Sequence, residues 1–202
     1  GLYASSLSGG INVKHFRQEL SRSPIFLFDD LNKSEEFQIW VEKNTKEIIK
    51  AAQSTTKHGK ILRIDQHAIQ NYVLLDFILD TGNAAGQNMV TLATNVACDY
   101  IRQQTGHDFF LDSNLASDKK ASYRNLILGR GHGVIAETHV SKSVMTRVLN
   151  VDPDFIIKNW TYFPIVSGMA GTHGNAIHVS NALTAIYLAT GQDTACVAEN
   201  SI

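Results

Sequence analysis

The sequence predicts a mixed α+β fold. Three observations lead to this expectation: short runs of β-branched and aromatic residues end at turn signals, two stretches carry apolar residues at helical spacing, and a glycine-rich region of different texture follows residue 112. With 202 residues, of which 44% are hydrophobic, the chain can bury the core of one large or two small domains.

The first predicted strand and helix are defined by local signals. Ile25 to Phe28 is a β-rich run followed by the turn signal Asp29-Asp30. Asn32, with Glu35 three residues later, has the spacing of a helix N-cap and its partner. Apolar residues then recur at helical spacing, so we expect an amphipathic helix that ends near residues 57–59.

Four further elements follow. Ile61 to Ile64 and Val73 to Leu79 are predicted strands, and Asp80-Thr81-Gly82-Asn83 breaks the pattern. The next apolar periodicity predicts a helix closed by Gly106, and Phe109 to Leu111 is the last strand candidate. The resulting β-α-β-β-α-β order is the ferredoxin-like arrangement.

Beyond residue 112 the expected elements are shorter. Leu126 to His139 alternates glycine and apolar residues and predicts one or two strands. Ser143 to Leu149 predicts a short helix, Ile165 to Asn175 is a glycine-rich stretch, and Ala176 to Thr190 predicts a helix closed by Gly191.

Bulk properties exclude several classes of function. The net charge of -1, without a basic block, argues against nucleic acid as a partner. Cys98 and Cys196 lack framework spacing, which indicates free thiols and a reducing, cytoplasmic location. No apolar run reaches the length of a membrane span, and no signal peptide is visible, so any anchor would lie outside this chain. Because the chain starts with Gly1, we interpret it as a fragment.

A first candidate site is the strand-to-helix turn that ends in Asn83-Ala84-Ala85-Gly86-Gln87-Asn88-Met89. Small residues let the backbone approach a ligand, and the free N–H groups at a helix start favour an anion. A single glycine-containing turn of this kind is more often an ordinary connection, so alone it is a weak signal.

A second candidate is Asp118-Lys119-Lys120. A lysine flanked by a carboxylate and a second cation can be tuned electrostatically, and it can donate a hydrogen bond to a developing oxyanion. The alternative interpretation is a solvated surface cluster of charges.

A third candidate combines His178 and Asn181, three residues apart on one face of the predicted helix, with Asp193 just beyond the helix end. A lone helical histidine is more often a satisfied packing residue, and a lone aspartate after glycine is usually a turn. The eight histidines lack the spacing of a zinc site, so no metal is expected, and no G-x-S-x-G elbow supports a serine hydrolase.

Together these segments resemble the class I 3-hydroxy-3-methylglutaryl-CoA (HMG-CoA) reductases. That family carries D-A-M-G-M-N-M at its cofactor helix, where this chain has Asn83 to Met89, and D-K-K, which matches residues 118–120. It then carries G-R-G, M-A-G, N-A-H-A-A-N and G-Q-D. The same order is found here in Gly129-Arg130-Gly131, Met169-Ala170-Gly171, Asn175 to Asn181 and Gly191-Gln192-Asp193. The resemblance covers nearly the whole chain.

The resemblance implies an enzyme that reduces the thioester of HMG-CoA to mevalonate by two hydride transfers from NADPH, with NADH as the alternative. It implies a small ferredoxin-like cofactor domain at residues 24–111, inserted in part of a larger α+β substrate domain formed by residues 1–23 and 112–202. In this family the active site forms between two subunits, so a homodimer or higher homo-oligomer is implied.

The resemblance also implies roles for individual residues. The first lysine of D-K-K, here Lys119, polarises the carbonyl oxygen, and the aspartate of G-Q-D, here Asp193, tunes its proton affinity. Residues 83–89 would bind the cofactor. The residues implied to bind substrate are Arg22, Asp118, Lys120, His178 and Asn181.

The chain departs from the family pattern at several positions. The family's catalytic glutamate and histidine lie outside residues 1–202, so we do not expect this chain alone to complete the reaction. Asn83 replaces the aspartate of the cofactor motif, and Asp76 stands where class I members carry an arginine. The alternative interpretation is therefore a catalytically eroded homologue that serves as a CoA- or nucleotide-binding module or as a structural partner.

Overall fold

A computed structural model describes residues 1–175 and 177–202. The chain forms two compact units, which are described separately. Unit 1 comprises Gly1–Arg17, Lys119–Gly129 and Gly133–Ile202, and unit 2 comprises Gln18–Asp118 and Arg130–His132. Helices and antiparallel strands occur together, so the predicted mixed α+β class is confirmed.

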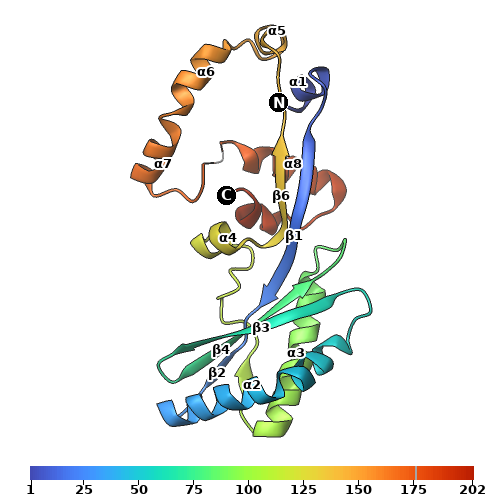
Figure 1. The fold of residues 1–202 in the computed structure, drawn as a ribbon, viewed down its shortest axis with the longest axis vertical. Coiled ribbons are helices and arrows are strands. Elements are labelled where there is room, and N and C mark those ends of the chain that lie inside the picture. Colours follow the sequence, from blue (N-terminus) through green and yellow to red (C-terminus); the bar gives the residue numbers. More distant parts are fainter. Residues whose placement is uncertain (176) are drawn as a thin grey trace. The chain divides into compact units, whose positions relative to one another are not determined.

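Unit 2 is an antiparallel sheet with two helices on one face (Figure 1). Strand β4 pairs with β3 along one edge and, along the other, with β2 and the C-terminal end of β1; β5 pairs with β2. From Ile25 onward the element order is that predicted from the sequence, whereas β1 was not predicted. The ferredoxin-like designation stays an interpretation of this order. The elements are β1 (Asn12–Arg22), β2 (Ile25–Leu27), α2 (Leu31–Gln53), β3 (Lys60–Ile69), β4 (Tyr72–Asp80), α3 (Gln87–Thr105) and β5 (Phe109–Phe110).

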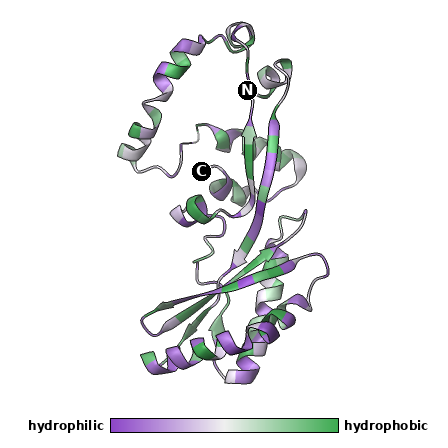
Figure 2. Cartoon of the chain, viewed as in Figure 1, coloured by the Kyte–Doolittle hydropathy of each residue, from purple (hydrophilic) through white to green (hydrophobic). Residues whose placement is uncertain are grey.

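The core of unit 2 lies between the sheet and the two helices. Alternate residues of β4 face the helices, since side chains along a strand point to opposite faces in turn. Hydrophobic and hydrophilic bands alternate along α2, as its sequence periodicity predicts (Figure 2). Burying one large side chain contributes about 1.5–3 kcal/mol. The β4 and α2 members of the core are Val73, Leu75, Phe77 and Leu79, and Phe37, Val41, Ile48 and Ala52.

Both ends of α2 differ from the sequence prediction. The N-cap is Asp30, not Asn32, and the Asp30 side chain accepts a hydrogen bond from the Lys33 backbone N–H at 2.9 Å. The predicted turn thus leads straight into the helix. The helix ends at Gln53, before residues 57–59, because the Gln53 side-chain amide donates to Gly59 O at 2.7 Å and its oxygen accepts from Ile61 N–H at 3.1 Å. This side chain closes the following loop.

The strands β3 and β4 are longer than the apolar runs that predicted them. Strand β3 continues past Ile64 through Asp65, Gln66 and His67 to Ile69, with Asp65 opposite Asp76 of β4. An edge strand pairs through its backbone, so it tolerates polar side chains that a pattern of apolar residues does not detect. The end of α3 agrees with the prediction: Gly106 follows it in the left-handed conformation, with φ +76°.

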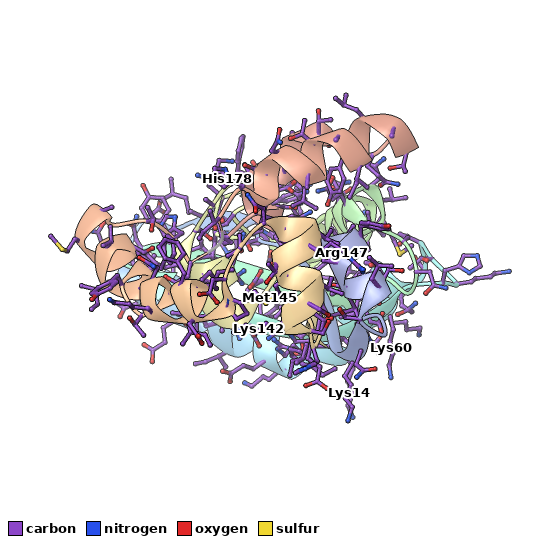
Figure 3. All side chains as sticks on the ribbon, turned by 90° about the horizontal axis from the view of Figure 1, so that it is seen from above. Lys14, Lys60, Lys142, Met145, Arg147 and His178 are labelled. Carbon is purple, nitrogen blue, oxygen red and sulfur yellow. The ribbon has the colours of Figure 1, made fainter. Side chains whose placement is uncertain are left out.

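Unit 1 consists of short helices beside a strand pair formed by β1 and β6. Figure 3 shows Lys142, Met145 and Arg147 on the turns of α5 and η1, and His178 at the start of α8. None of the helices among the described residues combines the length and the apolar content that crossing a bilayer requires. The elements are α1 (Leu2–Leu7), α4 (Tyr123–Leu128), β6 (Gly131–Glu137), α5 (Lys142–Val144), η1 (Met145–Leu149), α6 (Pro153–Trp160), α7 (Phe163–Ala170), α8 (Val179–Thr190), η2 (Thr194–Cys196) and α9 (Val197–Asn200).

Two predictions in unit 1 need correction. Residues 126–128, predicted as strand, end helix α4, because the Ser122 hydroxyl accepts from Asn125 N–H at 3.1 Å and starts a helix there. The helix predicted from Ala176 begins at Val179, and Ala176 itself lies outside the described residues. The predicted short helix at 143–149 is present as α5 and η1.

Candidate functional site

Lys119 and Asp193 form an ion pair in unit 1 although they are far apart in sequence. Lys119 Nζ lies 2.7 Å from Asp193 Oδ2, and the two side chains are 42% and 43% exposed. Asp193 Oδ1 accepts from the Ala195 backbone N–H at 3.0 Å, so Asp193 also caps η2. The hydrogen bond from Lys119, helped by that from Ala195, holds the pKa of Asp193 below its usual range. Asp193 is therefore an anion oriented toward an ammonium group.

The backbone of Lys119 is held as well. Its φ of +57° is left-handed, and its N–H donates to Glu199 Oε2 at 2.7 Å. Glu199 is buried on α9. The sequence motifs do not single out Glu199, because a lone glutamate after G-Q-D carries no spacing signal. Lys120, next in the chain, is exposed, and its carbonyl accepts from Asn125 Nδ2 at 3.3 Å.

Asp118 belongs to a charged cluster of unit 2 in which two arginines hold one carboxylate. Arg22 Nη2 donates to Asp118 Oδ2 at 3.0 Å, and Arg130 Nη2 donates to Asp118 Oδ1 at 2.9 Å. Arg22 Nη1 also donates to Asp112 Oδ2 at 2.8 Å. Burial raises the pKa of Asp118, but the charge and hydrogen bonds of Arg130 and Arg22 outweigh burial, so the pKa lies below its usual value. Asp118 therefore stays ionised.

The cluster occupies much of the hydrogen-bonding capacity of both guanidinium groups. Arg130 Nη1 also donates to the carbonyls of Ser21 and Ala116, at 3.3 and 3.2 Å. A carboxylate of a substrate would have to compete with Asp112 and Asp118 for Arg22. Beyond its place in G-R-G, no sequence signal indicates a role for Arg130, since its partner Asp118 lies 12 residues away.

The turn before α3 is shaped by contacts to Thr81 and Gly82. The Thr81 hydroxyl donates to Ala84 O at 2.8 Å, and Asp80 Oδ1 accepts from Gly82 N–H at 2.9 Å. Gly86 precedes α3 with φ +81°, and a Cβ on it would lie 2.3 Å from Thr81 Cγ2. Only glycine fits there without a shift of the chain.

The N-terminus of α3 has the character of an anion site. Among the described residues, no side chain caps this helix, and its first turn contains no acidic residue. Its first N–H groups and the helix dipole therefore present partial positive charge. Asn83, Ala84, Ala85 and Asn88 are exposed around it. The neighbouring Gln87 donates through Nε2 to Asp118 Oδ1 at 3.3 Å, which connects the turn to the charged cluster.

Asp76 does not lie exposed beside this turn. Its side chain is buried, and its Oδ1 accepts from the Ser23 hydroxyl at 2.6 Å. The carboxyl group that the sequence places near the candidate anion site is thus buried inside unit 2 and hydrogen-bonded to Ser23.

His178 and Asn181 do not share a helix face as the sequence predicts. His178 is the N-cap of α8 with φ +55°, so it precedes the helix, whereas Asn181 lies in its first turn. The left-handed backbone at His178 redirects its side chain relative to a helical residue. Both residues are exposed.

Two observations concern metal and thiol chemistry. Within residues 1–175 and 177–202, no three His, Cys, Asp or Glu side chains are grouped so that they could hold a metal ion. Cys98 and Cys196 are buried, and neither forms a disulfide. Burial raises the pKa of the Cys98 thiol, so it remains protonated.

Comparison with known proteins identifies the family. The family model described as hydroxymethylglutaryl-coenzyme A reductase matches residues 1–202. The chain belongs to this family. A 3-hydroxy-3-methylglutaryl-coenzyme A reductase of Methanothermobacter thermautotrophicus is 35% identical over 198 residues, which cover 96% of this chain and 50% of the relative. That of Aeropyrum pernix is 34% identical and is covered over 49% of its length. The chain thus spans about half the length of these reductases.

Solved structures of reductases have a similar fold. A 3-hydroxy-3-methylglutaryl-coenzyme A reductase of Streptococcus pneumoniae matches 95% of this chain and 50% of its own chain, with a TM-score of 0.61 and 14% identity. A class II reductase of the same organism, bound to NADPH in open conformations, matches 73% of this chain and 34% of its own, with a TM-score of 0.51 and 13% identity. These likenesses concern the fold of the reductase family.

Proposed function

We propose that the natural protein containing this chain reduces the thioester of HMG-CoA to mevalonate with NADPH. The observation that carries the proposal is the ion pair of Lys119 and Asp193, whose Nζ and Oδ2 atoms lie 2.7 Å apart in a family of HMG-CoA reductases. It joins the two segments, D-K-K and G-Q-D, that the family resemblance assigns to catalysis.

Lys119 supplies a charge where the reaction creates its opposite. Reduction of a thioester builds negative charge on the carbonyl oxygen, and a positioned ammonium stabilises that charge. By analogy with an oxyanion-hole donor, this lowers the barrier by about 3–4 kcal/mol. The carboxylate of Asp193 accepts a hydrogen bond from the Lys119 ammonium group and so holds it in position.

The turn from Asn83 to Met89 fits a phosphate-bearing dinucleotide. Gly86 leaves room where a Cβ would collide with Thr81, and the start of α3 is uncapped among the described residues. NADPH, or NADH as the alternative, would supply the hydride when bound there. In that role Gly86 and Gln87 offer backbone N–H groups to phosphate, and the exposed Asn83 and Asn88 offer side-chain amides.

The proposed substrate contacts follow the same assignment. Lys120 is exposed beside Lys119 and is proposed to bind the carboxylate of HMG-CoA, with His178 and Asn181 of the α8 segment as further contacts. We also propose that Arg22 and Asp118, which belong to the charged cluster, contribute to binding of the substrate. We also propose that the active protein is a homodimer or a higher homo-oligomer.

A second candidate is a homologue that binds CoA or a nucleotide without turnover. The observation in its favour is the engagement of Arg22 by Asp112 and Asp118 at 2.8 and 3.0 Å, which leaves less of this guanidinium for a substrate. Thermal stabilisation by CoA or a dinucleotide, without substrate-dependent oxidation of the cofactor, would favour this candidate.

The test uses the full-length natural protein with HMG-CoA and either NADPH or NADH, and follows the absorbance of the reduced cofactor. Substrate-dependent oxidation that is lost in Lys119→Ala supports the proposal. Lys46→Ala, which removes an exposed lysine of α2, is the matched control and should retain activity. The absence of oxidation with both cofactors refutes the reductase proposal.

A further inference from the structure

Glu199 is a buried carboxylate within unit 1 that contacts the backbone of Lys119. Its side chain accepts the Lys119 N–H through Oε2 at 2.7 Å, and the residue is 9% exposed. A carboxylate in such a position accepts a charge-assisted hydrogen bond, which is shorter and stronger than a bond between neutral groups. Glu199 therefore fixes the peptide group from which the Lys119 side chain extends.

The segment that carries Glu199 also carries Asp193. Asp193 caps η2, and α9 follows η2 directly, so Glu199 lies six positions after Asp193 in the sequence. Cys196 and Val197 between them are buried, and Asn200 Nδ2 donates to the Tyr187 hydroxyl of α8 at 2.6 Å. These contacts hold the segment from Asp193 to Asn200 in place without any contribution from Lys119.

The two acids hold opposite ends of Lys119. Asp193 receives the ammonium at 2.7 Å, whereas Glu199 receives the backbone N–H. The backbone between these contacts has φ +57°, a conformation that a lysine adopts only when its surroundings impose it. The Glu199 contact acts on this backbone directly.

We propose that Glu199 is a positioning residue that holds Lys119 in its left-handed conformation and so places the ammonium against Asp193. The catalytic consequence rests on the proposed reductase function, while the contact itself does not. Glu199 acts through the geometry of Lys119 and does not touch substrate. Its hydrogen-bond acceptor is what the role requires, so a glutamine, whose Oε1 can accept the same N–H, should replace it.

Kinetics of the full-length protein test the catalytic part. Glu199→Ala should lower kcat about tenfold or more, as expected for the loss of a charge-assisted hydrogen bond that positions a catalytic group, and should leave KM for HMG-CoA within about threefold. Glu199→Gln should keep kcat within about threefold of the wild type. The matched control is Glu42→Ala on the exposed side of α2, which should leave both constants unchanged.

Hydrogen exchange of the Lys119 amide tests the contact without any turnover. The amide should be protected in the wild type and in Glu199→Gln, and should exchange at least about tenfold faster in Glu199→Ala, because its acceptor is gone. A wild-type rate of exchange in Glu199→Ala, or a kcat equal to that of the wild type, overturns the proposal. So does a loss of kcat in Glu199→Gln as large as in the alanine variant.

The outcomes separate the inference from the proposed function. An inactive wild-type protein refutes the reductase proposal, and the exchange rates alone then decide whether Glu199 fixes Lys119. If Glu199→Ala does not fold, Glu199→Gln carries the test: protection of the Lys119 amide with retained kcat supports the proposal, and loss of either overturns it.

Discussion

Arg130 Nη2 lies 2.9 Å from Asp118 Oδ1, and the Arg130 side chain is only 4% exposed. Without Arg130, the buried carboxylate of Asp118 loses part of its charge compensation, because Arg22 also pairs with Asp112. We predict that Arg130→Met lowers the free energy of unfolding by about 3 kcal/mol, measured by urea denaturation of the full-length protein. Lys33→Met, which removes an exposed pair with Asp29, is the control and should cost far less, because solvent screens an exposed pair. Equal losses in the two variants would contradict the role of the cluster.

The pairing of Asp193 with Lys119 predicts a change in titration. The hydrogen bond from Lys119 lowers the pKa of Asp193 from its usual 3.8, so Lys119→Met should raise it toward that value. Because the folded pKa is depressed, the pair stabilises the folded state above about pH 4, and this stabilisation is lost as the pH falls through the folded pKa. The carboxyl carbon resonance of Asp193, followed by NMR, reports the shift. The control Lys46→Met should leave the pKa of Asp193 unchanged. If Lys119→Met also leaves it unchanged, the pairing does not exist in solution.

Two glycines with left-handed backbones, Gly106 and Gly86, allow the cost of the backbone conformation to be measured separately from the cost of a steric clash. Gly106→Ala, with φ +76° and no neighbouring atom within 4 Å of the added Cβ, should cost about 1–2 kcal/mol for the conformation alone. Gly86→Ala should cost about 1–3 kcal/mol more, because its Cβ would meet Thr81 at 2.3 Å. It should also weaken NADPH binding, measured by calorimetric titration. The steric account of Gly86 fails if both variants lose the same stability.

The start of α2 can be tested with neighbouring residues. Asp30→Ala removes the side chain that accepts from Lys33 N–H at 2.9 Å and should lower the free energy of unfolding by about 1 kcal/mol. Asn32→Ala lies inside the first turn and should be nearly neutral, because alanine suits a helix. A larger loss in Asn32→Ala, by thermal or chemical denaturation, would restore the N-cap that the sequence alone suggested.

The sequence predicts those parts of the fold that local chemistry determines. The element order from β2 to β5 follows from apolar periodicity, although β1 was missed, and the left-handed Gly106 follows from its position after α3. The order of the motifs also predicts that Lys119 and Asp193 act together, without any structural information. In each case the pattern that carries the prediction lies within a few neighbouring residues, or in several family motifs that occur in a fixed order.

The remaining features depend on contacts that local patterns do not encode. Glu199 and Arg130 find their partners 80 and 12 residues away, and each is a single charge without a spacing signal. His178 leaves the predicted helix face because its backbone is left-handed, which a helical periodicity cannot show. The polar half of β3 is a strand only because β4 provides its hydrogen-bonding partner.

The hydrophobic cluster from Leu20 to Ile101 lies entirely within unit 2, whereas the helices α6, α7 and α8 of unit 1 have no buried residue among those described. The heat capacity change of unfolding scales with the apolar surface that becomes hydrated. A differential scanning calorimeter should therefore record most of this change when unit 2 melts. Unit 1 should contribute a smaller and broader absorption of heat, so a single transition temperature would describe unit 2 rather than the whole chain.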